Sequence, residues 1–258
     1  MDTDEGVDIQ STIDKHCTLR MPCFAHTLQL VVKDGLGKLN AKSTRQLTAK
    51  CTKLCNLTHQ SALFRDAFEA KFGRGRSLPK ATDTRWNSTF RHLCSISNLD
   101  QAILATLLRE QSQHNLIISA KEFAILQELV EILQPFAEAT DLTQGESYPT
   151  IGCIVPSIVA LDSCLLELSA RVVHHASVIK ALQESLRRRF IGLFQRVQIL
   201  PAVSGVLTND AFGSILYFIA SLLDPTYGLL WLEDHPALVD VKQVLKDEII
   251  GIMFLSFS

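Results

Sequence analysis

Apolar residues recur at helical spacing along most of the chain. The first such segment is 24–36, where they fall at positions i, i+3, i+7 and i+11 and so share one face of a helix: Ala25, Leu28, Val32 and Leu36. The same spacing predicts further helices over about 42–58, 60–72, 84–110, 120–140, 150–170, 173–198, 211–223 and 236–250. No alternating pattern of any length is present. We therefore expect a mainly α protein with at most one or two strands before residue 25, one of them ending at 19–23.

Glycine and proline residues predict where some of these helices stop or bend. Gly35 and Gly37 are expected to end the first helix, because glycine is common at helix C-termini. Pro135 is expected to kink or break the helix over 120–140, because proline lacks the backbone N–H. The helix that begins at residue 84 is expected to be interrupted near Ser95–Asn98.

Length and composition restrict the class of protein. The 258 residues are enough for one large domain or two ordinary ones. The hydrophobic fraction is 47%, but no stretch approaches about 20 uninterrupted apolar residues, so we predict no transmembrane helix and no membrane partner. The acidic start, MDTDEGVDIQ, is unlike a secretory signal, and a cytosolic or nuclear location is the expectation.

Charge and cysteine content narrow the picture further. The seven cysteines are scattered, and in a reducing compartment such residues are usually buried small hydrophobes. The net charge of −2 excludes a polycation, so any contact with nucleic acid has to come from a local basic patch.

One such patch is the glycine-punctuated run Lys71-Phe-Gly-Arg-Gly-Arg-Ser-Leu-Pro-Lys80. Arg74, Arg76 and Lys80 are its candidate DNA-binding residues. Pro79 disfavours helix at the residue before it, so the run is expected to be a loop that leads into the next helix.

Arg85 and Trp86 follow this run at the start of that helix, where Asp83 or Thr84 is expected to cap it. A flat aromatic side chain beside several cations suits stacking on a nucleic-acid base. The alternative is that Trp86 is buried and anchors the helix to the core. The pattern alone leaves both interpretations open.

Two groups of residues have spacing that allows metal binding. Cys23-x-x-His26 is half of a zinc site, and zinc needs about four ligands. Its alternative is a hydrogen-bonded His26 at a helix N-terminus. The set Cys51-x3-Cys55-x3-His59 allows ligation, but it also suits a core-facing stripe with a polar end. No metal site is predicted with certainty from these patterns.

Two charged clusters complete the candidate chemistry. Asp4, with Asp2 and Glu5, either supplies a carboxylate to a magnesium site or belongs to a solvated tail. Arg187–Arg189 is interpreted as the solvated face of a helix near its middle, with contact to phosphate or to an acidic partner as the alternative. The sequence contains no phosphate loop, nucleophile elbow or dinucleotide-binding fingerprint, so no self-contained catalytic constellation is predicted.

Several blocks of the sequence resemble, in order, the hAT transposase superfamily. They are the block MPCFAHTLQLVVKDGL over 21–36, the block ATDTRWNSTF over 81–90, the block LQPFAEATDLTQGE over 133–146, and LLDP over 222–225. The third block resembles sequences of one branch of this superfamily, the domesticated zinc-finger BED-domain-containing proteins. The resemblance covers nearly the whole chain.

This resemblance implies an RNase H-like fold interrupted by a large all-helical insertion. Applied to this chain, it predicts a partial RNase H-like core over 1–38, a helical insertion domain over 39–248 and an atypical tail over 249–258. The chain would then be a fragment that contains neither the BED finger nor the C-terminal dimerisation region.

The resemblance also implies roles for individual residues. The family's catalytic triad is Asp, Asp and Glu, and only its second aspartate has a match here, Asp4. We therefore expect no catalysis and neither of the family's metals, the Mg²⁺ of active transposases and the zinc of the BED finger. Trp86 matches the tryptophan that stacks on a flipped base, which is worth about 1–3 kcal/mol per base, and Arg85 matches a neighbouring arginine suited to a phosphate or base contact.

The expected function is that of a nuclear, non-catalytic, DNA-associated regulator of transcription. One alternative is a helical protein-interaction scaffold without DNA binding, with a second copy or nuclear proteins as partners. The other is a piece of an active transposase, whose missing acidic residues would lie elsewhere in a longer protein.

Overall fold

The structure is a computed structural model. The residues that it describes are 21–39, 42–81, 86–143, 150–201, 210–233, 235, 238, 243, 245–247 and 251. Throughout these residues the regular structure is helical and contains no strand, which confirms the predicted mainly α class. Residues 21–23 have no regular structure, so the predicted strand does not extend through them. The partial RNase H-like core stays a prediction.

The α-helices are α2 (Phe24–Leu36), α3 (Lys42–Gln60), α4 (Ala62–Phe72), α5 (Trp86–Ser97), α6 (Gln101–Glu110), α7 (Ala120–Thr143), α8 (Ile154–Ser169), α9 (Ala176–Arg189), α10 (Ile191–Arg196) and α12 (Ile215–Leu223). Short 3-10 turns lie between them: η1 (His114–Leu116), η2 (Ile151–Cys153), η3 (Ala211–Gly213) and η4 (Leu230–Leu232).

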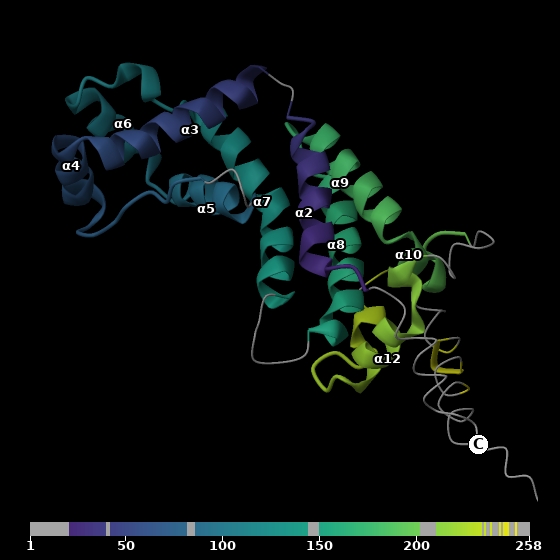
Figure 1. Ribbon diagram of the computed structural model, residues 1–258. Coiled ribbons are helices and arrows are strands. Elements are labelled where there is room, and N and C mark those ends of the chain that lie inside the picture. Colours follow the sequence, from purple (N-terminus) through teal and green to yellow (C-terminus); the bar gives the residue numbers. More distant parts are fainter. Residues whose placement is uncertain are drawn as a thin grey trace, which may run out of the picture.

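The long helix α7 joins two groups of helices (Figure 1). On one side it packs against α3 and α5, which lie with α4 and α6 at one end of the molecule. On the other side it packs against α2 and α8, which lie beside α9 and lead to α10 and α12. The molecule is therefore elongated, with α7 between its two ends.

Several predicted boundaries are confirmed, and the structure gives their physical reasons. Ser61 caps α4 by accepting a hydrogen bond from the Phe64 N–H at 3.2 Å. The predicted break in 84–110 separates α5 from α6, and Asp100 caps α6 by accepting from the Ile103 N–H at 2.9 Å. Gly73 ends α4 with φ of 111°, a conformation that suits glycine.

Three expectations about breaks are wrong. Gly35 does not end α2 but lies buried within it, against Leu182 of α9. Pro135 lies inside α7 without breaking it, so of the two alternatives, a kink or a break, the break is wrong. The segment 173–198 is not one helix, because the backbone turns at Phe190 (φ −119°, ψ 33°) between α9 and α10.

One contiguous hydrophobic core runs through the described residues. At its centre in the α2–α9 half, the Phe190 ring lies 5.7 Å from the Phe24 ring and 4.5 Å from the Phe212 ring, measured between centroids. The turn between α9 and α10 is thus held by aromatic packing. The segment Ile151–Ser169 is apolar and long enough to span a membrane, but most of it is buried inside this helical packing, as in a core helix.

Candidate nucleic-acid interface

The basic run predicted as a loop connects α4 to α5, and its second half is held in place by α3 and α5. Leu78 is only 1% exposed. Its carbonyl oxygen accepts from His59 Nε2 at 2.8 Å, and the Pro79 carbonyl accepts from His92 Nδ1 at 3.0 Å. Cys55 Sγ lies 3.4 Å from both carbonyl oxygens. We call residues 73–81 the clamped loop.

The cations of the clamped loop point away from this anchor. Arg74, Arg76 and Lys80 are exposed, and none of them has an ion-pair partner among the residues that the structure describes. Gly75, with φ of 73°, helps the chain to turn between the two arginines. The sequence prediction that these three cations lie on a loop is therefore confirmed, and the loop presents positive charge from a fixed backbone.

His92 is the buried member of the anchor. Its Nδ1 donates to the Pro79 carbonyl, so in the neutral ring Nε2 carries no proton, and Nε2 is buried without a partner among the described residues. Burial lowers the pKa of His92, against the opposing effect of the bond to Pro79. The neutral form therefore fits this environment.

The position of Trp86 agrees in part with each of the two interpretations that the sequence left open. Trp86 is the first residue of α5, is partly exposed, and packs against the core with its ring centroid 6.1 Å from that of Phe90. The core-anchor interpretation thus holds in part, while the remaining surface of the ring stays accessible. Arg85, the neighbouring candidate, lies outside the described residues, as do Asp83 and Thr84.

The predicted metal ligands do not come together. Cys23 and His26 are both exposed at the start of α2. No group of three or more His, Cys, Asp or Glu side chains in the described part of the chain is arranged to hold a metal ion. Asp4 lies outside the described residues.

Cys51 and Cys55 form the core-facing stripe that was one of their two interpretations. Both are buried in α3, and burial raises the pKa of Cys51 to about 12. His59 is the polar end of the stripe, and it binds the Leu78 carbonyl rather than a metal. These residues therefore support the clamped loop.

The triple-arginine run is a solvated face only at Arg188, whereas Arg187 and Arg189 are half-buried, contrary to expectation. It forms the last turn of α9, where cations interact favourably with the helix dipole. Arg187 binds both carboxylate oxygens of the fully buried Asp162 at 2.9 Å each. Arg188 and Arg189 both bind Oδ2 of Asp34, at 2.8 and 2.9 Å. The run is held by two aspartates that lie far away in the sequence.

Three acidic residues thus have structural roles that the sequence analysis missed: Asp34, Asp162 and Glu128. Glu128 accepts hydrogen bonds from the consecutive N–H groups of Val173, His174 and His175 at 2.7–2.8 Å, just before α9 begins. The only signal for Asp162 was its position among the apolar residues of α8. The other two had no local signal.

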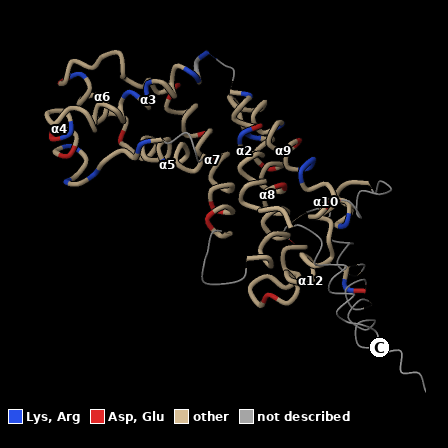
Figure 2. The backbone as a smooth tube through the Cα atoms, viewed as in Figure 1, with Lys and Arg blue, Asp and Glu red and all other residues tan. Residues whose placement is uncertain are grey.

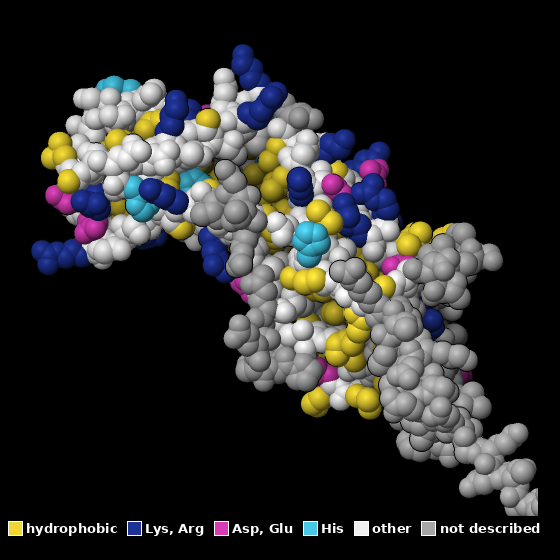
Figure 3. Space-filling model, in the orientation of Figure 1, with side chains coloured by type: hydrophobic (Ala, Val, Ile, Leu, Met, Phe, Trp, Pro, Cys, Tyr) yellow, Lys and Arg dark blue, Asp and Glu magenta, His cyan; other side chains and the backbone are white. Residues whose placement is uncertain are grey.

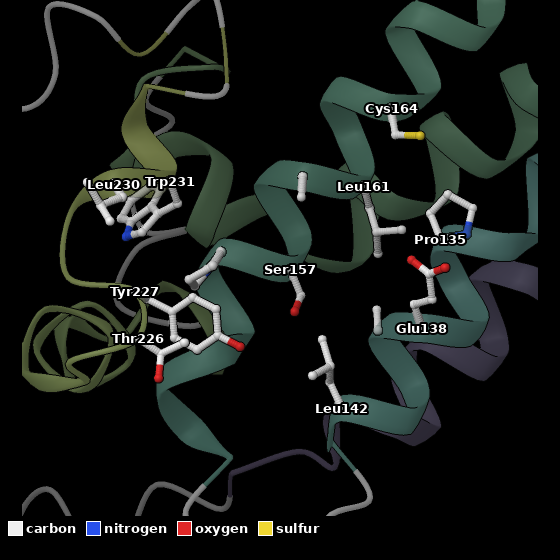
Figure 4. Close-up of a pocket in the computed structure, with 13 residues that line it drawn as sticks. Pro135, Glu138, Leu142, Ser157, Leu161, Cys164, Thr226, Tyr227, Leu230 and Trp231 are labelled. Atoms are coloured by element: carbon white, nitrogen blue, oxygen red, sulfur yellow. The ribbon is translucent and has the colours of Figure 1, made fainter.

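A second surface feature is an apolar cleft of about 490 Å³ between α7, α8 and the segment 226–231. Figure 4 shows Ser157 and Tyr227 on one side of it and Pro135, Glu138 and Leu142 on the other. Glu138 is its one charged lining residue among the described residues.

Comparison with known proteins places part of the chain in a family. Residues 21–132 match the family model described as the ZBED1 RNase-like helical domain. The matched segment runs from the start of α2 into α7 and includes the clamped loop. No curated protein matches the chain significantly. The match confirms the resemblance over the part of the chain that contains the first two sequence blocks, 21–36 and 81–90.

Proposed function

Starting from the ZBED, hAT-derived relationship of residues 21–132, we propose that the chain is a nuclear, non-catalytic, DNA-associated regulator that contacts DNA through the clamped loop. The observation that carries this proposal is the set of three exposed cations, Arg74, Arg76 and Lys80, on a loop whose second half is anchored by His59 and His92. A net charge of −2 requires a local contact of this kind.

The contacts that anchor the clamped loop affect the affinity for DNA as well as the position of the loop. Ordering a loop on binding costs conformational free energy, of the order of 1–2 kcal/mol per backbone residue. Because Leu78 and Pro79 are already fixed by buried contacts, less of that cost falls on the binding step. Lysine and arginine side chains on such a loop suit phosphate contacts, which fix the position of a protein on DNA but do not read its sequence.

The proposal that the chain is non-catalytic rests on how few of the family's catalytic acidic residues have a match in the sequence. Nucleases of this chemical class use two metal ions held by several carboxylates. Asp4 is the one residue of the sequence that matches the family triad. An active transposase would therefore need acidic residues from outside this chain.

A variant with Arg74→Ala, Arg76→Ala and Lys80→Ala tests the role of the clamped loop. Its matched control is Arg65→Ala, Arg109→Ala and Lys121→Ala, which removes the same charge from exposed positions elsewhere. Binding to a labelled 20-base-pair duplex is measured by fluorescence anisotropy over a range of salt concentrations. If all three cations touch phosphates, the slope of log K against log salt falls by about 2.7 in the loop variant only. Equal slopes in both variants would refute the proposed contact.

Trp86 and Arg85 need a separate experiment, because their proposed role is a base contact. Trp86→Ala and Arg85→Ala are compared with the wild type on a duplex that carries one unpaired 2-aminopurine. We expect reduced affinity and loss of the fluorescence change that accompanies stacking, with Trp86→Phe retaining part of it. Thermal melting controls for lost core packing at Trp86. No binding at low salt, or binding unchanged by both substitutions, would remove this motif from the proposal.

The second candidate is a helical interaction scaffold whose partner is a second copy of the chain. The observation that favours it is the apolar cleft, at whose edge Leu142 and Leu230 are 43% and 64% exposed. Sedimentation of the wild type and of the Leu142→Ser, Leu230→Ser variant tests it. A concentration-dependent dimer that the variant lacks would support the scaffold, and a wild-type monomer would count against it.

A further inference from the structure

A second cationic surface lies in a cleft between the C-terminal half of α2 and the helix α9. The cleft has a volume of about 460 Å³. Its charged lining residues are Lys33, Asp34, Lys38, Glu184 and Arg188. Arg188 belongs to the triple-arginine run, for which phosphate contact was one of the interpretations left open by the sequence.

Asp34 organises the floor of this cleft. Its Oδ2 atom accepts from Ser185 Oγ at 2.6 Å, from Arg188 at 2.8 Å and from Arg189 at 2.9 Å. The bond from Ser185, together with those from the arginines, holds the pKa of Asp34 below its ordinary value although burial opposes the shift. Asp34 is therefore ionised at neutral pH and fixes two guanidinium groups in place.

The balance of charge in the cleft is positive. Lys33, Lys38 and Arg188 line the cleft with two carboxylates, so its lining has an excess of one positive charge, and Arg189 adds a further cation at Asp34. Arg188 is 68% exposed, and its one bond to Asp34 leaves most of its N–H groups available. Lys33 and Lys38 are exposed and have no ion-pair partner among the described residues. A fixed guanidinium flanked by two lysines is suited to a phosphate group.

Positive charge continues from the cleft along α3. This helix contains no acidic residue but three lysines and one arginine: Lys42, Arg45, Lys50 and Lys53. Lys50 pairs with Glu122, whereas Lys42 and Lys53 are exposed and fall on one helical face. Figure 2 shows lysine and arginine positions in blue along the backbone of α3, α2 and α9, and Figure 3 shows the side chains of such residues on the same edge of the molecule.

Helix α3 connects the two cationic surfaces. Its C-terminal end carries Cys55 and His59, which anchor the clamped loop, and its N-terminal end follows α2 in the chain. A helix of 19 residues is about 28 Å long, which corresponds to about eight base pairs of duplex DNA. One duplex can therefore lie along α3 and reach both ends.

We propose that the cleft of Lys33, Lys38 and Arg188 is a second contact site for the sugar-phosphate backbone of duplex DNA. The duplex runs along α3 between the cleft and the clamped loop. This inference rests on the proposed function, since it extends the same bound duplex. The ligand chemistry is a phosphodiester, and inorganic phosphate is the competing source of the same anion.

The test is the variant Lys33→Glu, Lys38→Glu, with Arg109→Glu, Lys121→Glu as the matched control of equal charge change. All four residues are exposed, and thermal melting checks that each variant folds. On the 20-base-pair duplex we expect about tenfold weaker binding near physiological salt for the cleft variant only. Lys33→Gln, Lys38→Gln should lower the salt slope by about 1.8. Equal affinity of the cleft and control variants would overturn the inference.

Two further comparisons distinguish DNA contact at the cleft from DNA contact at the clamped loop and from binding of free phosphate. If the loop variant described above binds as its control does while the cleft variant is weakened, the clamped-loop proposal fails and the cleft contact stands. If the loop variant is weakened and the cleft variant is not, the inference alone fails. Calorimetry with inorganic phosphate tests whether the cleft instead binds the free anion. If the wild type binds free phosphate tightly and the cleft variant does not, the assignment to DNA would be overturned.

Discussion

Gly35 of α2 lies so close to Leu182 of α9 that a β-carbon on Gly35 would overlap the leucine side chain. Both residues are buried, and the two helices run antiparallel, since Phe24 at the start of α2 lies beside Phe190 at the end of α9. The contact also brings Asp34 within reach of Ser185 and the arginines of α9. The glycine is thus required for helix packing.

Gly35→Ala should destabilise the protein by about 1–3 kcal/mol, because overpacking forces the helices apart or the leucine off its rotamer. Leu182→Ala alone should cost about 2–5 kcal/mol through lost burial. In the double variant the added methyl group occupies vacated space, so the total should be less than the sum. Urea unfolding measures all three. Gly251→Ala, where nothing lies within 4 Å, is the control, and an effect of Gly35→Ala no larger than this control would contradict the packing argument.

The buried Asp162 predicts an asymmetry between single and double substitution. Asp162→Leu leaves the Arg187 guanidinium without its two bonds and should cost about 3–5 kcal/mol. Asp162→Leu combined with Arg187→Met removes both charges and should restore much of the loss. Chemical denaturation gives the comparison. A double variant as unstable as the single one would show that the pair itself, and not an unpaired charge, carries the effect.

His92 predicts a loss of stability at mildly acidic pH. Burial lowers its pKa in the folded protein, so below its unfolded pKa of about 6.5 the unfolded chain binds more protons. The free energy of unfolding should therefore fall as the pH drops below about 6.5. Burial also lowers the pKa of His175, which adds to the loss with the same sign.

Denaturation at pH 7.5 and 5.5 tests this, with His92→Gln as the partner variant. Glutamine retains an N–H donor for the Pro79 carbonyl but does not titrate. The variant should lose less stability between the two pH values than the wild type. The lowered pKa values of Asp34, Glu122 and Glu128 act below about pH 4.5, outside this window. An identical pH dependence in both proteins would rule out His92 as a contributor.

Glu128 caps α9 from a different helix, so its removal should loosen the start of α9. Glu128→Ala leaves three N–H groups without their acceptor and should cost about 1–3 kcal/mol. Hydrogen exchange should rise first at residues 173–175. Glu131→Ala is the control, because Glu131 forms only an exposed ion pair with Arg171, worth up to about 1 kcal/mol. Unchanged exchange at 173–175 would contradict the capping role.

The helices were predictable from the sequence because their apolar spacing is strong and local. The bounds of α2 agree with the prediction, and the break between α5 and α6 follows from local capping by Asp100. The continuity of α7 was not predictable, because packing on both sides of the helix offsets the missing N–H of Pro135. The turn at Phe190 depends on ring contacts with Phe24 and Phe212, which are distant in sequence.

The candidate site was predictable only in its residue types. The basic loop could be located from its cations, glycines and Pro79, but its anchor could not, since His59 and His92 lie on other helices. Cys55 and His59 even suggested a metal site, because i, i+4 spacing serves a core stripe and a ligand pair alike. The triple-arginine run was misassigned for the same reason, as its partners Asp34 and Asp162 are 154 and 25 residues away from Arg188 and Arg187.

The uninterrupted path of α7 has a consequence for dissecting the molecule. The family match stops at Ile132, in the middle of this helix, just before the buried residues Leu133 and Phe136. A recombinant piece cut at that point would split α7 and remove α9, which packs on α2, together with α8, which packs on α7 and α9. The segment defined by evolutionary similarity is therefore smaller than the contiguous hydrophobic core, and deletion experiments should keep the core from Phe24 to Leu245 together.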